Sequence, residues 1–199
     1  MGNTSKTGTA PELDGRLRRS ERSREAIVQA LISLVGEGVL QPTAEQVAEQ
    51  AGVGIRTVFR HFSDMETLNA ALNAHIEEEL LPILLADAPE GSLEGRARAL
   101  IDQRATLFEK MGPYRRAGNL VRWRSPFLQK QHITLVRQLR SDLRRWLPEL
   151  RGAPDDLVEA LDLAASFEAW DRLRTEQRLS RMRAVEVMRR VVVALVREL

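Results

Sequence analysis

The sequence has no cysteine, a single tyrosine and only 5% aromatic residues among 199 positions. The absence of cysteine excludes disulfide bonds and thiolate metal sites, and it is compatible with a reducing compartment. No uninterrupted apolar run approaches the roughly 20 residues that a membrane-spanning helix needs. The polar start, MGNTSKTGTAPELDG, does not have the pattern of a signal peptide. We therefore expect a cytoplasmic protein without a membrane segment.

Strand-like alternation of apolar and polar residues is also missing, as are internal repeats. Apolar residues make up 43% of the chain and charged residues 29%, which is typical of a globular protein. The net charge is only +2, but arginines are concentrated at positions 16, 18, 19, 22 and 24. A locally basic segment of this kind can still fit a phosphate surface. The sequence predicts an all-α fold.

Catalytic and metal-binding signatures are lacking as well. The chain has three histidines, and no nucleophile motif, glycine-rich phosphate loop or zinc signature accompanies them. His75 has Glu78 and Glu79 at helical spacing, which is compatible with a metal site, but we interpret this group as a solvated acidic face. We expect no metal, no cofactor and no enzymatic activity.

The N-terminal part has the pattern of a helix-turn-helix. We expect residues 1–15 to form a disordered tail and residues 16–80 to form the first domain. An apolar helical face is made by Ile27, Ala30, Leu31, Leu34 and Val35. Thr43 and Gln46 form a capping box that opens a helix ending at Gly52, and Ser63 and Glu66 form a second capping box. The short segment between these two helices is a candidate recognition helix.

The rest of the chain, residues 81–199, is predicted to form a second, helical domain. Pro82 is expected to kink or end the helix that begins near Ser63. Further helices are expected over residues 92–111, 114–122, 126–146, 154–177 and 180–199, because prolines and glycines cluster at the breaks.

Residues 43–68, TAEQVAEQAGVGIRTVFRHFSDMETL, resemble the TetR family of bacterial transcriptional regulators. The resemblance covers about residues 20–80. The positions that carry it are Thr43, Val47, Ala48, Ala51, Gly52, Val53, Thr57, His61, Phe62 and Leu68. It implies an N-terminal helix-turn-helix DNA-binding domain, followed by a helical domain that binds a small-molecule effector and forms the dimer.

Three positions depart from the family pattern. Gly54 stands where the family usually has serine, which leaves a weaker helix N-cap. Phe59 replaces a tyrosine and Met65 replaces a lysine, so two groups that can meet a phosphate are missing. These departures predict weaker anchoring on the DNA backbone, with Arg60 or the N-terminal arginines as compensating contacts.

The predicted DNA-binding residues lie around the recognition helix, whose N-terminal part faces base edges in the major groove. Arg56 is the candidate base reader, because a guanidinium pairs bidentately with guanine, and Ile55 is placed to meet a thymine methyl group. Phosphate contacts are predicted for Thr43, Thr57, Arg60 and His61. Val53, Val58 and Phe62 are predicted to hold the helix to its neighbours. The complete predicted set is Thr43, Gly54, Ile55, Arg56, Thr57, Phe59, Arg60 and His61.

The second domain contains most of the large side chains, and these supply the candidate effector site. The predicted set is Phe108, Met111, Tyr114, Trp123, Phe127, His132, Phe167 and Trp170, with His132, Asn119 and Arg122 as the candidate polar groups. Aromatic residues at helical spacing are also the ordinary content of a core, and both interpretations stay open.

A homodimer through the last two helices is expected from their double apolar stripes. One helix carries Ala184, Val187, Met188, Val191, Val192 and Leu195, and the preceding one carries apolar residues on two sides between positions 157 and 173. A helix that is apolar on two sides needs two neighbours, and one of them can be another subunit.

The sequence thus predicts a DNA-binding regulator, most simply a repressor that a small molecule releases from a palindromic operator. Two alternatives stay open. The chain can be a helix-turn-helix protein that has lost strong DNA affinity and acts through protein partners, or a small helical enzyme.

Overall fold

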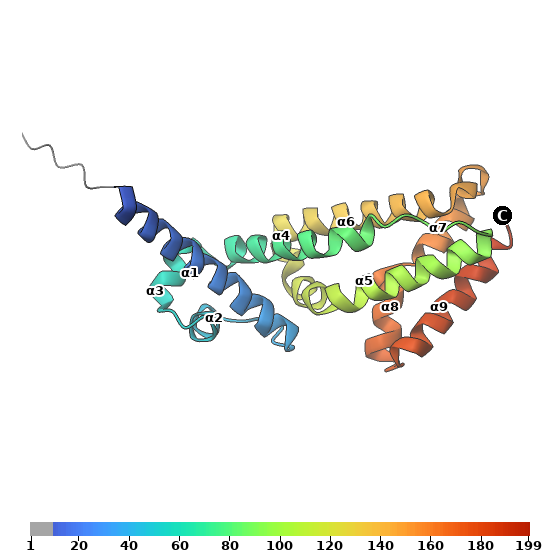
Figure 1. The fold of residues 1–199 in the computed structure, drawn as a ribbon. Helices are drawn as coiled ribbons and strands as arrows, with labels where there is room; N and C mark the ends of the chain where they lie inside the picture. The colour runs from blue at the N-terminus through green and yellow to red at the C-terminus, as the bar shows by residue number, and fades with distance from the viewer. Residues whose placement is uncertain (1–9) are drawn as a thin grey trace, which may run out of the picture. The chain divides into compact units, whose positions relative to one another are not determined.

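The computed structural model describes residues 10–199, and these form helices and connecting turns without any strand (Figure 1). The predicted all-α class is confirmed. The first four helices are α1 (Ala10–Gly36), α2 (Ala44–Gln50), α3 (Ile55–His61) and α4 (Met65–Leu84). The later ones are α5 (Leu93–Val121), α6 (Pro126–Trp146), α7 (Asp155–Ala164), α8 (Phe167–Asp171) and α9 (Arg181–Val196). Short turns of helix follow α5, α6 and α8 at Arg122–Arg124, Pro148–Gly152 and Arg172–Glu176.

The chain folds as two compact units, one that ends at Ala74 and one that comprises His75–Leu199. The boundary lies inside α4, six residues before the predicted one after residue 80. Of the predicted disordered tail, residues 1–9 lie outside the described part of the chain, whereas α1 already includes positions 10–15. The first helix is therefore longer than its apolar pattern indicated, because its N-terminal half is polar and carries no periodicity.

The N-terminal unit packs α1 against α2 and α3. The predicted apolar face of α1 is buried, with Ile27 and Leu31 at 0% exposure. Val47, Val58 and Phe62 meet this face and are each no more than 2% exposed. Burial of one apolar side of each short helix holds the three helices together, since helices of seven residues are not stable alone.

Helix α4 begins with a different cap from the predicted Ser63–Glu66 box. The backbone N–H of Thr67 donates to Oδ1 of Asp64 at 2.7 Å, so Asp64 is the residue that satisfies the first turn. This hydrogen bond lowers the pKa of Asp64. At the other end α4 stops at Leu84, two residues after Pro82, as predicted.

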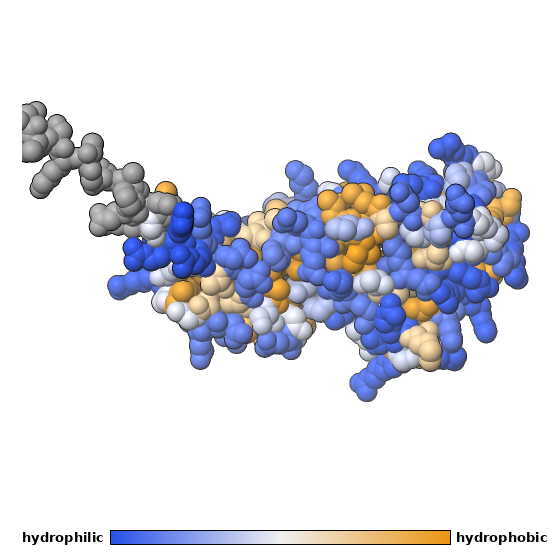
Figure 2. Space-filling model, in the orientation of Figure 1, coloured by the Kyte–Doolittle hydropathy of each residue, from blue (hydrophilic) through white to orange (hydrophobic). Residues whose placement is uncertain are grey.

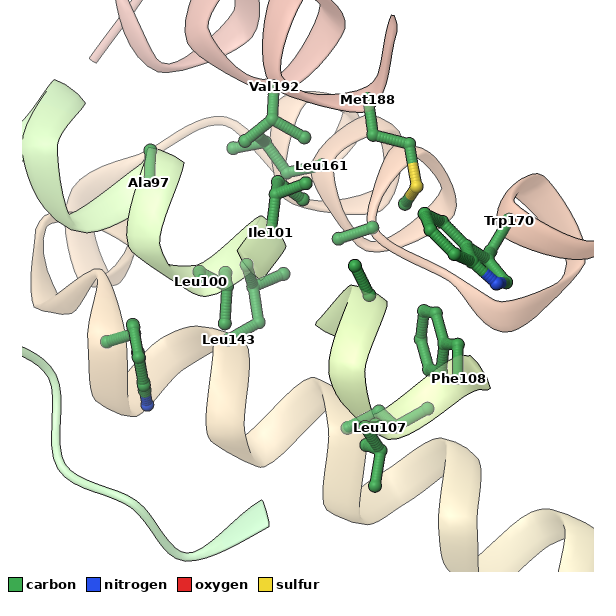
Figure 3. Packing of buried hydrophobic residues seen from close by; sticks show 14 of the residues in the cluster. Ala97, Leu100, Ile101, Leu107, Phe108, Leu143, Leu161, Trp170, Met188 and Val192 are labelled. Atoms are coloured by element: carbon green, nitrogen blue, oxygen red, sulfur yellow. The ribbon is translucent and has the colours of Figure 1, made fainter. Parts of the chain in front are cut away.

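The C-terminal unit is built around α5, which packs against α6, α8 and α9, while α7 packs against α9 (Figure 3). Its core joins apolar side chains of these helices. Figure 3 labels Ala97, Leu100, Ile101, Leu107, Phe108, Leu143, Leu161, Trp170, Met188 and Val192. No helix among residues 10–199 has the length and apolar character required to cross a membrane.

Two helix boundaries in this unit differ from the prediction. Helix α5 continues through Gly112 and Pro113 to Val121, although a break was expected there. Packing of its flanking turns outweighs the single backbone hydrogen bond that the proline removes. The helix expected over residues 154–177 is instead interrupted at Ala165, where Ser166 caps α8 by accepting a hydrogen bond from the N–H of Ala169 at 3.1 Å.

Candidate nucleic-acid interface

Helices α2 and α3 are joined by a tight turn. The capping box at the start of α2 is confirmed, because Thr43 and Gln46 exchange hydrogen bonds of 2.9 and 3.3 Å. Gly52 has a φ of +65°, a conformation that residues with a β-carbon rarely adopt. The N–H of Val53 then donates to the carbonyl oxygen of Ala48 at 3.0 Å. These contacts fix the direction in which α3 leaves α2.

Helix α3 has one buried and one exposed side. Val58 is 1% exposed and faces α1, which confirms its predicted packing role. The exposed side, which we call the reader face, consists of Ile55, Arg56, Phe59 and Arg60. Ile55 is 37% exposed and Phe59 49% exposed, so two large apolar side chains lie in water beside two guanidinium groups. Gly54 provides the N-cap in an extended conformation without a side-chain hydrogen bond.

His61 and Thr43 lie in surroundings that disfavour the phosphate contacts predicted for them. Nε2 of His61 is buried and has no hydrogen-bond partner among the described residues. Burial, followed by the charges of Arg60 and Arg24, lowers the pKa of His61 and so disfavours a positively charged imidazole. The Thr43 hydroxyl serves the capping box, and Glu45 places a carboxylate in the same first turn. A phosphate there would meet negative charge.

The arginines of α1 add positive charge to the N-terminal unit, and one of them, Arg24, lies next to the end of α3. Arg18, Arg19, Arg22 and Arg24 are exposed. The guanidinium carbon of Arg24 lies 5.2 Å from the centre of the Phe62 ring, a cation–π contact that ties α1 to the C-terminal end of α3. Thr57 is half-buried between the two sides of α3. The N-terminal unit thus presents arginines from two helices.

The predicted effector residues fall into three groups. Phe108, Met111, Phe167 and Trp170 are no more than 3% exposed and belong to the core. Tyr114, Phe127 and His132 are half-buried. Trp123 is 77% exposed and lies on the surface, and Asn119 is exposed as well.

Contacts bring some of these groups together. The rings of Phe108 and Phe167 meet edge to face with centroids 5.6 Å apart. Nη2 of Arg115 lies 2.7 Å from Nδ1 of His132. Arg115 was not among the predicted residues, although it lies four residues after Met111 and seven after Phe108, on the same side of α5.

Solved structures share this fold. A transcriptional regulator from Rhodococcus sp. Rha1 superposes with a TM-score of 0.69 at 19% identity, over 90% of this chain and 96% of that chain. A putative TetR-family regulator from Mesorhizobium loti has a TM-score of 0.56 at 24% identity, over 89% and 96%. A putative regulator from Streptomyces coelicolor A3(2) has a TM-score of 0.57 at 18% identity, over 86% and 98%. No protein-family model and no curated protein sequence matches. The TetR-like fold predicted from residues 43–68 is thereby confirmed.

Proposed function

We propose that this protein is a DNA-binding transcriptional regulator of the TetR type, and that it is a repressor which a small-molecule effector releases from a palindromic operator. The reader face of α3 is the observation that carries this proposal. It displays Arg56 and Arg60 to solvent on a helix whose other side is fixed by burial. Side chains used only for packing would not leave arginine and large apolar groups exposed together.

The position and exposure of Arg56 support a role in base reading. It is the second residue of α3, it is exposed, and it has no ion-pair partner among residues 10–199. Ile55 and Phe59 supply apolar surface next to it, which fits the methyl groups of thymines in the major groove. Arg60 and the arginines of α1 supply the charge for phosphates, where His61 and Thr43 are poorly placed.

A gel-shift assay and a footprint on the DNA next to the protein's own gene test this function directly. Saturable protection of a palindromic segment supports a regulator. Capture of a protein partner through the reader face without DNA binding would support the partner-binding alternative, because Ile55 and Phe59 would then form a protein contact.

Arg56→Ala should weaken binding to the protected operator by about 1–3 kcal/mol and should relax the preference at one base position, because one bidentate base contact is lost. The measurement is a titration against operators that carry every single-base change. Arg60→Ala is the matched control on the same face. It should lower the affinity for all operator sequences equally and reduce the salt dependence of DNA binding. If Arg56→Ala instead lowers the affinity for every operator variant equally, Arg56 contacts a phosphate and not a base.

Tryptophan emission should report the effector, since Trp123, Trp146 and Trp170 all belong to the C-terminal unit. A true effector should change the emission and weaken operator binding over the same concentration range. Operator DNA should weaken effector binding by the same factor, because coupling between two sites is reciprocal. A compound that changes emission and leaves DNA affinity unchanged is not the effector. A broad screen that yields only such compounds would leave a constitutive DNA-binding protein.

The dimer that a palindrome requires has a suitable surface on the C-terminal unit. Helices α7 and α9 pack together, and their outer sides expose Leu163 at 69% and Val191 at 44%. Val187 and Leu195 of α9 are half-buried beside them. In contrast, Phe167 and Trp170, which belong to the apolar stretch between positions 157 and 173, are turned into the unit's own core. We propose that α7 and α9 form the homodimer interface.

A further inference from the structure

We call three side chains from separate elements the cationic cluster: Arg115 of α5, His132 of α6, and Arg122 of the turn after α5. Burial, together with the charge of Arg122, lowers the pKa of Arg115 and that of His132. Nη2 of Arg115 lies 2.7 Å from Nδ1 of His132. A guanidinium only donates hydrogen bonds, so Nδ1 must accept and the imidazole is neutral. Burial and the charges of Arg115 and Arg122 lower the pKa of His132, which agrees with this assignment.

The cationic cluster is short of negative charge. Its paired acid among residues 10–199 is Glu168, whose Oε1 lies 3.5 Å from Nη2 of Arg115. The Glu168 side chain is 56% exposed, whereas that of Arg115 is 14% exposed, so the cation is buried more deeply than its counter-charge. Arg122 is half-buried and has no ion pair within the described part of the chain. The two guanidinium groups thus have one solvated carboxylate near them, and it pairs with Arg115 alone.

Hydrogen-bond acceptors are also missing. Nε of Arg115 and Nη1 of Arg122 are buried and have no partner among the described residues. Buried guanidinium N–H groups without acceptors are unfavourable, because they have lost water and gained nothing in exchange. A ligand that brings acceptor oxygens and one negative charge would correct both deficits.

Phe167, a core residue that is 2% exposed, adjoins the cationic cluster through Arg115. The guanidinium carbon of Arg115 lies 5.6 Å from the centre of the Phe167 ring, and Phe167 meets Phe108 edge to face at an interplanar angle of 84°. Planar guanidinium forks match the geometry of a carboxylate, and neighbouring aromatic rings favour an apolar body. The combined chemistry is that of an organic acid.

We propose that Arg115, Arg122 and His132 bind the carboxylate of a small organic acid whose apolar part packs toward Phe167, and that this acid is the effector. Only the last clause rests on the proposed function. Glu168 occupies Arg115 in the absence of the acid and competes with it. His132 supports the site by holding Arg115 through its Nδ1 atom.

Benzoate and hexanoate, compared with benzamide and hexanamide, are suitable probes, and calorimetric titration of the full chain without DNA is the measurement. Each acid should bind at least about tenfold more tightly than its neutral amide, because charge-assisted hydrogen bonds are the stronger ones. Arg115→Gln and Arg122→Gln should each lower the affinity for the acids by about tenfold and leave the affinity for the amides unchanged. Glu168→Gln should raise the affinity of the protein for each acid, because it removes the competing carboxylate.

Arg124→Gln is the matched control, since Arg124 is exposed on the same turn as Arg122. It should leave acid affinity unchanged. Arg122→Gln should keep or raise the thermal unfolding midpoint of the ligand-free chain, whereas a structural arginine would lower it on removal. Any of three results would overturn the proposal. The protein could bind an acid no more tightly than its amide, Arg124→Gln could lower acid affinity as much as Arg122→Gln does, or Glu168→Gln could lower acid affinity. Failure of operator binding alone would refute the regulator function and leave the acid site standing.

Discussion

Replacing Asp142 by leucine should lower the free energy of unfolding of the C-terminal unit by about 3–5 kcal/mol, because a buried guanidinium loses its counter-charge. Arg104 of α5 is 1% exposed and Asp142 of α6 is 4% exposed. Nη2 of Arg104 lies 3.1 Å from Oδ2 of Asp142 and donates to the carbonyl oxygen of Leu139 at 2.6 Å. Burial lowers the pKa of Arg104 to about 10, so the side chain remains charged at neutral pH. Urea unfolding followed by tryptophan emission measures the loss.

The exposed pair of Arg140 with Glu159 provides the matched control. The Glu159 side chain is 59% exposed, and Glu159→Gln should leave the free energy of unfolding nearly unchanged, because water screens an exposed ion pair. The double variant Arg104→Met with Asp142→Leu should recover most of the lost stability, because apolar groups can replace a buried pair when both charges are removed. An Asp142→Leu variant as stable as Glu159→Gln would show that the pair is not a buried charge pair.

Leu163→Arg and Val191→Arg should each convert the proposed dimer into a monomer, because either change places a charge in the apolar surface formed by α7 and α9. Operator affinity should fall by about 10²-fold or more, since a monomer engages one half-site and loses the effective concentration that links the two. Sedimentation at micromolar concentration and a gel-shift titration measure the two effects together.

A second apolar surface on the same unit makes a stringent control. Figure 2 shows hydrophobic residues gathered over the C-terminal half of α4 and over α6. Leu85, directly after α4, is 62% exposed, and Ile133 of α6 is 48% exposed. Leu85→Arg should leave the dimer intact. Dissociation by Leu85→Arg, with Leu163→Arg remaining dimeric, would move the interface to α4 and α6.

Local sequence rules predicted the N-terminal unit well, because its structure depends on short-range contacts. The Thr43–Gln46 capping box and the apolar face of α1 are formed by residues three or four positions apart. The same rules misplaced the α4 cap, since Ser63 and Asp64 are both good caps and only the backbone path selects Asp64. Continuation of α5 through Pro113 depends on packing with other helices, which no local pattern records.

The candidate sites also divide into features that follow from local sequence and features that depend on helix packing. Exposure of Ile55, Arg56 and Arg60 on α3 follows from helical spacing once Val58 and Phe62 are assigned to the buried side. The contact of Arg115 with His132 joins residues 17 positions apart on two helices, and it arises only when α5 packs against α6. The aromatic residues do not by themselves distinguish a core from a ligand site, because burial in the core and lining of a ligand site select the same side chains.

The cationic cluster is complete within one chain, since α5, the turn after it and α6 supply all of its residues. A dimer would therefore have two complete and separate acid sites but bind a single operator. Suppose that one bound acid leaves the second subunit on its half-site, so that the dimer leaves the operator only when both acid sites are filled. Gene expression would then rise more steeply with acid concentration than the occupancy of a single site does. The Hill coefficient of such a dose response has the number of sites as its upper limit. Its value would tell how strictly the two subunits must act together.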